Sequence, residues 1–301
     1  MRAMFLIIGE ILFDIFPNGK RIGGAPFNFA FHLKKLGFPV KFVSRVGNDQ
    51  NGEEILTFLA DHGFDTQDIQ IDESHGTGVV EVKTCQGSGH SFTIVPNKAY
   101  DYIDYNIIPK QYFHSDLRLI YFGSLIQRRK ISAENFQDMM RLKPQHAATF
   151  CDINLRPDCY VRQTIKNSLL ITDTLKLNQD EFDEISSWFL SDASLENRVV
   201  QLKDIFHIKT VILTMGDQAS HWFHHHQHYE KTIPEIQGVV DTVGAGDAYA
   251  AICAAGIICR LPMKKITALA VEFASHICQN KGALPEDLSI YQPLAKQLGV
   301  K

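Results

Sequence analysis

The sequence lacks the features that mark several large classes of protein. Lys and Arg number 30 and Asp and Glu number 34 in 301 residues, so the formal net charge is −4 and the isoelectric point is near 6.3. Nucleic-acid-binding domains usually have an isoelectric point above ~9 and clustered basic residues, so we expect no nucleic-acid partner. The longest apolar stretch, Ala248–Cys259, is shorter than the ~18 residues that indicate a membrane span, so we expect no membrane contact.

Cysteine is scarce and forms no CxxC pair. The six cysteines are Cys85, Cys151, Cys159, Cys253, Cys259 and Cys278. Most lie in apolar surroundings, which favours reduced, buried thiols. The apolar run at the N-terminus is interrupted by Glu10 and Asp14, so it is too short and too acidic for a signal peptide. These observations predict a soluble, cytoplasmic protein.

Several nucleotide-binding motifs are also absent. The sequence has no G-x-x-x-x-G-K-[ST] P-loop and none of the H-R-D or D-F-G motifs of protein kinases. A Rossmann dehydrogenase would need a G-x-G-x-x-G fingerprint after its first strand, and Ile8-Gly9-Glu10 does not supply one. Any nucleotide must therefore be bound by other means.

Strand-like apolar runs alternate with helical patterns over most of the chain. The expected strands are 5–8, 40–43, 119–122, 149–151, 174–177 and 211–213. The first expected helix carries Phe29, Leu33 and Leu36 on one face and stops at Gly37, and the second is marked by Ile55, Leu56 and Leu59 and ends near Gly63. The other expected helices are 133–142, 181–189, 195–206, 246–259 and 263–279. This alternation predicts an α/β fold, Rossmann-like, with a mostly parallel sheet and helices on both faces.

The alternation breaks between Thr66 and Asp104, where no helical period is found. Gly78–Lys83 and Ser91–Val95 are typical of strands joined by a Gln86–Gly89 turn, and 15–22 with Pro17-Asn18-Gly19 indicates a further extended piece. We expect a small β-sheet lid from 15–24 and 66–104, inserted into a core of 1–14, 25–65 and 105–301. Such a lid can form a homodimer contact, although a monomer is equally compatible with the sequence.

The strongest chemical signal is the run Asp241-Thr242-Val243-Gly244-Ala245-Gly246-Asp247, which leads into an apolar helix. The small residues allow a ligand to approach the backbone, and N–H groups at a helix N-terminus favour an anion. Asp247 beside them could accept a proton from an attacking hydroxyl. A simple N-cap aspartate after a glycine-rich turn explains the run equally well by itself.

A second motif is Gly23-Gly24-Ala25-Pro26-Phe27-Asn28-Phe29-Ala30. Its paired glycines precede a helix, and Asn28 would offer an amide donor and acceptor to a polyol. A solvated strand-to-helix turn is the simpler alternative, and the motif is weak alone.

Together these two motifs resemble the signatures of the PfkB (ribokinase-like) carbohydrate kinase family. Smaller motifs stand between them in that family's order: Gly9-Glu10…Asp14, Tyr121-Phe122-Gly123-Ser124, Asp152-Ile153-Asn154-Leu155-Arg156, Asn178…Glu181, Thr214…Gly216 and Lys281-Gly282-Ala283. The resemblance spans about residues 5–285. It implies the ribokinase-like fold and an ATP-dependent kinase that transfers a phosphoryl group to an alcohol.

The resemblance also implies roles for individual residues at the phosphoryl and sugar sites. Asp247 corresponds to the catalytic base, and the backbone N–H groups of Gly244, Ala245 and Gly246 correspond to the anion hole. Residues that would hold sugar hydroxyls are Asp14, Gly24 and Asn28.

Further correspondences concern the nucleotide and its ions. Asn178 and Glu181 match a motif associated with phosphate and Mg²⁺, with Glu181 acting through water. An exposed helix start would explain that pair without the other motifs. Nucleotide contacts are implied for Thr214, Gly216, Gly282 and Ala283, and a monovalent cation such as K⁺ for Asp241 and Thr242. The implied cofactors are thus ATP, Mg²⁺ and K⁺, and the implied partners are ATP and a small sugar.

The substrate is less closely defined. The Gly-Gly-Ala-Pro-x-Asn variant and Asp152…Asn154…Arg156 are most similar to the fructokinase branch, with fructose phosphorylated at a primary hydroxyl. Arg156 is a substrate-binding candidate in either that branch or a 2-keto-3-deoxygluconate-type sugar-acid kinase. A phosphosugar substrate would need several basic side chains that converge on its phosphate, and the candidates are Lys20, Arg21, Lys98 and 128–130. A nucleoside substrate would need an aromatic side chain to stack on its base, such as Phe92 or Tyr100.

Two departures and one alternative class complete the sequence picture. Ala219 stands where a glycine is common after Gly216, and Ile153 where a proline is common, whereas the catalytic motif is intact. A catalytically silent, sugar-binding regulatory relative is the main alternative from another class.

The histidine-rich segment His221–His228 indicates a surface hairpin with alternating exposed imidazoles. Adventitious metal affinity is favoured over a functional metal site in this segment.

Overall fold

A computed structural model describes residues 3–17, 19–85 and 89–300 of the chain. Residue 18 of the expected 17–19 turn and residues 86–88 of the expected hairpin turn lie outside the described residues. No helix in the described part of the chain is long and apolar enough to cross a membrane.

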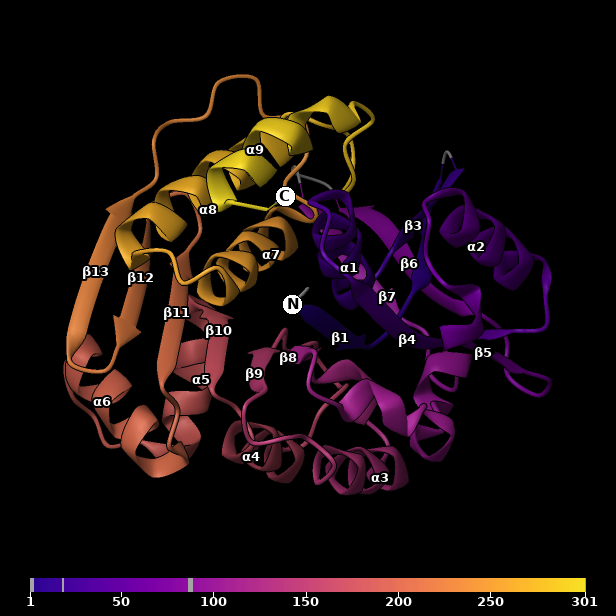
Figure 1. Ribbon diagram of the computed structural model, residues 1–301, viewed down its shortest axis with the longest axis horizontal. Helices are drawn as coiled ribbons and strands as arrows, with labels where there is room; N and C mark the ends of the chain where they lie inside the picture. The colour runs from indigo at the N-terminus through magenta and orange to yellow at the C-terminus, as the bar shows by residue number, and fades with distance from the viewer. Residues whose placement is uncertain (1–2, 18, 86–88, 301) are drawn as a thin grey trace.

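A nine-stranded sheet forms the centre of the molecule (Figure 1), in the order β13-β12-β11-β10-β9-β8-β1-β4-β5. Its strands are β1 (Met4–Ile8), β4 (Val40–Gly47), β5 (Ile69–Asp72), β8 (Leu117–Phe122), β9 (Ala148–Asp152), β10 (Thr174–Asn178), β11 (Thr210–Met215), β12 (Ala219–His224) and β13 (Gln227–Thr232). The pairs from β5 to β11 are parallel, and β12 and β13 add an antiparallel hairpin at one edge. The expected, mostly parallel sheet is confirmed.

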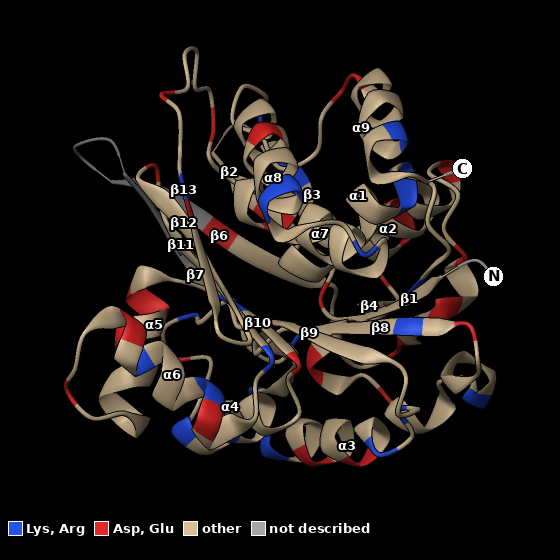
Figure 2. Cartoon of the chain, turned by 60° about the vertical axis from the view of Figure 1, so that its left-hand side comes forward, with Lys and Arg blue, Asp and Glu red and all other residues tan. Residues whose placement is uncertain are grey.

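Helices cover both faces of this sheet, as the edge-on view in Figure 2 shows. One face is covered by α1 (Ala25–Lys35), α2 (Gln50–Asp61), α7 (Ala245–Ile258), α8 (Met263–Ile277) and α9 (Tyr291–Leu298). The other is covered by α3 (Lys130–Met140), α4 (Arg162–Leu170), α5 (Gln179–Phe189) and α6 (Leu195–Phe206). Each layer buries its own apolar cluster against the sheet. Sequence periodicity missed α4 and α9, which are short and mainly polar outside the stripe that each one buries.

Helix α7 is the most deeply buried of the helices described. Residues 248–256 are all buried, between α1, α8 and the sheet. A Cβ atom at Gly256 would lie 2.6 Å from Cγ1 of Ile266, so the glycine allows α8 to pack closely. A helix that is apolar all round is stable only when it is covered on all sides, which fixes the N-terminus of α7 relative to the sheet.

A separate four-stranded sheet forms the lid, in the order β3-β2-β6-β7. Its strands are β2 (Leu12–Phe16), β3 (Gly19–Gly23), β6 (Gly78–Cys85) and β7 (Gly89–Ile94). Two boundaries differ from the expected segments. Strand β2 begins at Leu12, so Asp14 belongs to the lid sheet, and β5 pairs with β4 in the large sheet because Ile69 packs into the core.

Short 3-10 helices connect the lid segment to the core and recur in later loops. They span Thr66–Asp68, Ala99–Tyr102, Tyr105–Ile107, Lys110–Phe113, Leu125–Gln127 and Leu288–Ile290. The stretch expected to lack helical periodicity therefore contains single turns, which are too short to produce a period.

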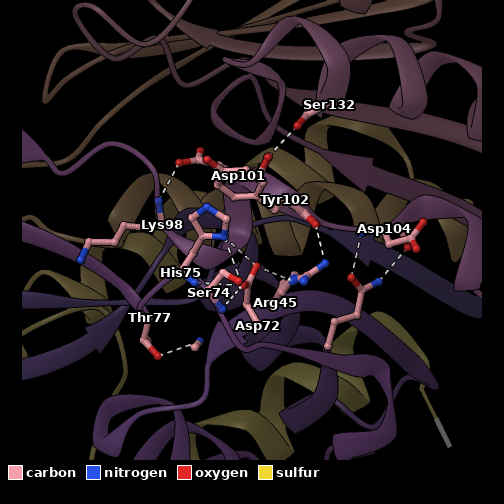
Figure 3. A network of polar contacts seen from close by, with 12 residues as sticks. Arg45, Asp72, Ser74, His75, Thr77, Lys98, Asp101, Tyr102, Asp104 and Ser132 are labelled. Carbon is pink, nitrogen blue, oxygen red and sulfur yellow. Dashed lines mark hydrogen bonds and ion pairs between the residues drawn. The ribbon is translucent and has the colours of Figure 1, made fainter.

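Polar contacts fix both ends of the β6–β7 hairpin to the core (Figure 3). Thr77, just before β6, donates through its hydroxyl to Asp49 Oδ1 at 2.6 Å and accepts from the Gly47 N–H at 3.0 Å. After β7, the Lys98 N–H donates to Asp101 Oδ2 at 3.0 Å, and Asp101 is also bound by Arg128. The β6–β7 hairpin is thus held in place by polar contacts just before β6 and just after β7.

The aromatic packing between α1 and β8 gives a first prediction. Phe29 is fully buried, and its ring stacks on Tyr121 with the ring centroids 3.9 Å apart. Phe29→Ala should lower the free energy of unfolding by about 3–5 kcal/mol, because it opens a cavity between α1 and β8. Urea denaturation would measure this change, with the exposed Ile107→Ala as a control that should cost less than about 0.5 kcal/mol.

Candidate active site

The chemistry-bearing residues from distant parts of the sequence meet at the carboxyl edge of the parallel strands. Glu10 follows β1, Asp152 ends β9 and Asn178 ends β10, while α7 begins above the same edge. Ligands of open α/β sheets bind at this edge, outside the carboxyl ends of the strands. The topology therefore places the expected site where such folds hold their ligands.

The turn that begins α7 is fixed by a close contact. Gly244 has φ +81°, and a Cβ atom there would lie 2.2 Å from the Cβ of Ala283, so glycine is required on both counts. Asp241 joins the same two loops, because Oδ1 accepts from the Val243 N–H and Oδ2 from the Gly282 N–H, each at 3.1 Å. The expected anion-binding turn and the expected nucleotide loop are thus one packed unit.

The two signature motifs meet through a side-chain hydrogen bond. Asn28, in the first turn of α1, donates from Nδ2 to Oδ2 of Asp247 at 2.8 Å, across 219 positions of sequence. The other amide atom, Asn28 Oδ1, is buried and has no hydrogen-bond partner. This arrangement orients the Asp247 carboxylate and leaves an acceptor beside it.

The environment of Asp247 favours its protonated form. The pKa of Asp247 is raised to about 7. Burial is the largest cause and the charge of Asp152 adds to it, while Asn28, Lys176 and Arg156 oppose the rise. A carboxylate with a pKa near 7 is a much better proton acceptor at neutral pH than an exposed aspartate.

The lid contributes Asp14 next to the paired glycines. A Cβ atom at Gly23 would lie 2.5 Å from Asp14 Oδ2, and one at Gly24, where φ is +109°, would lie 2.6 Å from the carbonyl oxygen of Glu10. Burial raises the pKa of Asp14 to about 6, while the charges of Arg156 and Arg21 oppose the shift. The glycines therefore make room for a partly buried carboxyl group above the cleft.

A cavity of about 510 Å³ lies between the lid and the nucleotide loop. Its lining includes Asp14 and Arg21 from the lid and Gly282 and Ala283 from the loop. One residue expected to bind sugar, Asp14, and two expected to bind nucleotide, Gly282 and Ala283, thus border a common space. Asn28, Arg156 and Asp247 are not part of its lining.

Arg156 lies in an exposed loop after β9. Its positive charge opposes the rise that burial causes in the pKa of four carboxyl groups: Glu10, Asp14, Asp152 and Asp247. Asn154, two residues earlier, has φ +44°, a left-handed conformation that turns this loop back over the site.

Two charged residues at the site were not expected as functional residues. Glu10 is 4% exposed, its Oε2 has no hydrogen-bond partner, and burial raises its pKa to about 7. Lys176, on β10, pairs with both carboxylate oxygens of Asp152 at 3.1 and 2.9 Å. A lysine inside an apolar strand was the available sequence signal for this pair.

Asn178 and Glu181 form a capping box at the start of α5 rather than an exposed helix start. Asn178 Oδ1 accepts from the Glu181 N–H at 2.9 Å, and Glu181 Oε2 accepts from the Asn178 N–H at 2.8 Å. Glu181 is buried, and its Oε1 accepts from the Leu155 N–H at 2.9 Å. Because both oxygens are occupied, Glu181 ties α5 to the loop that carries Arg156.

Thr214 and Gly216 lie at the end of β11, next to Asn178. Thr214 donates from its hydroxyl to the carbonyl oxygen of Leu177 at 3.4 Å, and Gly216 has φ +55° in an open turn. Ala219, the departure from the common glycine, is the buried first residue of β12. The alanine is accommodated because it falls on a strand instead of in the turn.

The histidine-rich segment forms the β12–β13 hairpin, but its imidazoles do not alternate as expected. His221 is buried, and its Nδ1 lies 3.1 Å from Nε2 of the exposed His228. No group of three or more metal-ligating side chains was found in the described ranges of the chain. Of the cysteines that the structure describes, Cys151, Cys159, Cys253 and Cys278 are buried and free, and Cys259 is partly exposed and free.

A family model described as pfkB family carbohydrate kinase matches residues 17–288. The chain belongs to that family. It is a carbohydrate kinase.

Curated relatives of this kinase share about a quarter of its residues. A sugar kinase of Pyrococcus horikoshii is 27% identical over 85% of this chain and 83% of its own. A 5-dehydro-2-deoxygluconokinase of Geobacillus thermodenitrificans is 23% identical over 92% and 89%, and a fructokinase of Escherichia coli is 26% identical over 83% of each chain.

Solved structures share the fold. A fructokinase from Xylella fastidiosa with bound ATP has a TM-score of 0.84 at 23% identity, covering 99% of this chain and all of its own. A double-mutant fructokinase from Vibrio cholerae, with fructose, ADP and a potassium ion, has a TM-score of 0.78 at 20% identity, with coverage of 99% and 98%.

The buried, unpaired carboxyl group of Glu10 generates a stability prediction. Its pKa is raised from 4.5 to about 7, so its contribution to stability is fully present below pH 4.5 and is lost as the pH rises through 7. Glu10→Gln should therefore raise the free energy of unfolding at pH 8, by at most about 3 kcal/mol, and should change it little at pH 4.5.

Thermal unfolding of the ligand-free protein between pH 4.5 and 8.5 would measure this effect. The exposed Glu272→Gln on α8 is the matched control and should leave the pH dependence unchanged. Equal stabilisation by Glu10→Gln at both ends of the pH range would contradict the assignment.

Proposed function

We propose that this kinase transfers the γ-phosphoryl group of ATP to a primary hydroxyl of a small sugar, with fructose the first substrate to test. The observation that carries the proposal is the contact between Asn28 and Asp247 at the N-terminus of α7. The contact supports the proposal because it joins a proton acceptor to an amide that could bind a polyol, at the N-terminus of α7. Of the backbone donors assigned there, the Ala245 N–H donates to the carbonyl oxygen of Thr242 at 3.3 Å and would have to exchange that bond for one to the phosphoryl group.

The proton transfer is assigned to Asp247. With its pKa near 7, its carboxylate takes the proton of the sugar hydroxyl as the oxygen attacks the γ-phosphorus. A new O–P bond forms, the bond to the β,γ-bridging oxygen breaks, and ADP leaves with that bond's electron pair. The backbone N–H groups of Gly244, Ala245 and Gly246, at the positive end of the α7 dipole, stabilise the charge on the transferred group.

Magnesium enters this scheme with the substrate, as MgATP. Both carboxylate oxygens of Glu181 accept one backbone N–H bond each and keep a further lone pair. Its assignment to a nucleotide-bound Mg²⁺ through water rests on the tendency of Mg²⁺ to keep several water ligands. Thr214, Gly216, Gly282 and Ala283 are assigned to the nucleotide, and Asn178 to its phosphates.

The proposed K⁺ site at Asp241 and Thr242 has a competing internal cation. Arg21 of the lid lies 3.6 Å from Asp241 Oδ2, on the loop that would carry the ion. A carboxylate and exposed loop oxygens are suitable potassium ligands. Potassium binding near Asp241 would therefore weaken the contact between Arg21 and the loop.

Asp14, Gly24 and Asn28 are assigned to the sugar. Two sugar types are favoured by the relatives: fructokinases and 5-dehydro-2-deoxygluconokinases both match over most of their lengths. Arg156, whose charge reaches Asp14 and Asp247, is the residue that a sugar-acid carboxylate would pair with. A sugar acid is therefore the second candidate substrate.

Nucleoside and phosphosugar substrates have less support. Tyr100 is fully buried beneath Arg128, with the guanidinium carbon 5.3 Å from the ring centroid, so it offers no open stacking face. The side chain of Phe92 lies outside the described residues. Arg128 is paired with the buried Asp101, so it is not available for a substrate phosphate. Lys130 makes only a surface pair with Glu134, at 3.8 Å.

A substrate screen tests this assignment directly. ADP release would be measured with fructose, ribose, 2-keto-3-deoxygluconate, 5-dehydro-2-deoxygluconate, nucleosides and phosphosugars.

Asp14→Ala should raise KM for the best substrate at least tenfold, because it removes a hydroxyl acceptor from the lid. Unchanged KM and kcat would remove Asp14 from the site, and sugar binding without turnover on any substrate would favour a regulatory protein.

The general-base assignment predicts a second kinetic result. Asp247→Asn should lower kcat by roughly 10²–10⁴-fold, because the amide cannot accept the proton, while sugar affinity changes little. In the wild type, kcat/KM should fall as the pH drops below about 7, since Asp247 must be ionised to act. Initial rates from pH 5.5 to 9 would show both effects, and the exposed Asp204→Asn on α6 is the matched control. Near-wild-type turnover by Asp247→Asn would exclude this mechanism.

A further inference from the structure

A buried ion pair lies directly beneath the proposed phosphoryl site. Lys176 on β10 and Asp152 on β9 are neighbours in the parallel register of these strands, and their side chains are 10% and 2% exposed. The ammonium contacts both carboxylate oxygens, at 2.9 and 3.1 Å. Burying two charges costs more than a surface pair, so this pair adds little net stability and calls for another explanation.

The side chain of Lys176 faces the N-terminus of α7. Its neighbours on the strand, Leu175 and Leu177, pack into the apolar cluster on the opposite face of the sheet. A Cβ atom at Gly246 would lie 3.2 Å from Lys176 Nζ. The ammonium therefore lies immediately behind the backbone of the anion-binding turn.

Gly246 and Gly244 are both glycine, but a side chain would meet a different neighbour at each position. Gly244 must leave space for Ala283, whereas Gly246 leaves space for a charged group. A side chain at position 246 would press on the ammonium, which would have to shift by a few tenths of an ångström. The Gly-Ala-Gly run thus lies against Ala283 at Gly244 and against Lys176 at Gly246.

Resting on the function proposed above, we propose that Asp152 and Lys176 form a positioning pair for phosphoryl transfer. Lys176 holds a fixed positive charge behind the anion-binding turn and keeps Asp247 ionised, and Asp152 holds Lys176 in that place. Neither side chain needs to touch the substrate, because both act through the turn and through Asp247.

The charges around Asp247 are consistent with this role. The titratable and charged groups that face it are Glu10 after β1, Tyr121 on β8, Asp152 on β9, Arg156 in the following loop and Lys176 on β10, with the neutral Asn28 on α1. Asp152 raises the pKa of Asp247, and Lys176 and Arg156 lower it. Burial disfavours the ammonium, but Asp152, Glu181 and Asp247 together raise the pKa of Lys176 above its ordinary value, so it stays charged.

The two members of the pair act on Asp247 with opposite signs, which makes the proposal testable by a double-mutant cycle. Lys176→Met should move the acidic limb of kcat/KM to higher pH by about one unit and lower kcat at pH 9 by roughly tenfold or more. The double variant Asp152→Asn/Lys176→Met leaves the net charge near Asp247 unchanged, so its acidic limb should return to within about 0.3 units of the wild type. Lys176→Arg, which keeps the charge, should retain the wild-type limb.

A second readout uses the ligand-free protein and needs no turnover. Carbon-13 NMR of aspartate carboxyl groups, with the Asp247 resonance identified by its loss in Asp247→Asn, would follow the titration of that group directly. Its midpoint should rise in Lys176→Met and return in the double variant. If Lys176→Met does not fold, Asp152→Asn gives the same test with the opposite sign, because Glu181 and Asp247 still favour the ammonium.

The outcomes separate this proposal from the proposed function. An unchanged Asp247 titration in folded Lys176→Met would overturn the positioning pair and leave the general-base assignment intact. A shifted titration without a shifted kinetic limb would show that Asp247 is not the base, which would overturn both. Equal shifts in the single and the double variant would overturn the role of Asp152.

Discussion

Burial of carboxyl groups at the carboxyl edge of the parallel sheet is the constraint on which the rest of the site depends. Glu10 is buried, Asp14 and Asp247 are partly buried, and burial raises the pKa of each well above its ordinary value. Such a cluster is destabilising unless cations compensate it. Lys176 from below and Arg156 from above supply that compensation, so the strands and loops that carry them must be held in place.

The scaffold meets this requirement with backbone contacts. Glu181 binds the N–H groups of Asn178 and Leu155, which joins α5 to the loop of Arg156. Asp241 binds the N–H groups of Val243 and Gly282, which joins the anion-binding turn to the nucleotide loop. Glu181 and Asp241 resemble metal ligands, but each of their carboxylate oxygens accepts a backbone N–H bond. A cation that bound there would share these oxygens with the backbone or bind them through water.

The lid sheet packs on the core through Leu12, Phe13 and Val80 and carries two charged residues toward the candidate site. Asp14 and Arg21 reach the site from β2 and β3, while the β6–β7 hairpin is held at Thr77 and Asp101. Arg21 also pairs with Asp241, so the same lid residue contacts the loop that precedes α7.

Much of the fold could be predicted because its signals are local. Alternating apolar runs indicated the parallel strands and most helices, and the break after Thr66 indicated the lid. Helices α4 and α9 and the start of β2 at Leu12 were missed, because short segments carry too few periodic positions. The candidate site residues were chosen by motif, whereas Glu10 and Lys176 were not expected as functional residues, because a single charge next to or within an apolar strand does not reveal its partner.

The sequence by itself determined the α/β class, the order of the motifs and the presence of Asp247 after a Gly-Ala-Gly turn, since each depends on residues close together in the chain. The tertiary structure alone decided which of these residues meet. Asn28 reaches Asp247 across 219 positions, and Lys176 reaches the back of Gly246, because neighbouring strands and two buried helices bring them together. Their pKa values follow from that burial, because the energy of a charge depends on everything packed around it and not on its neighbours in sequence.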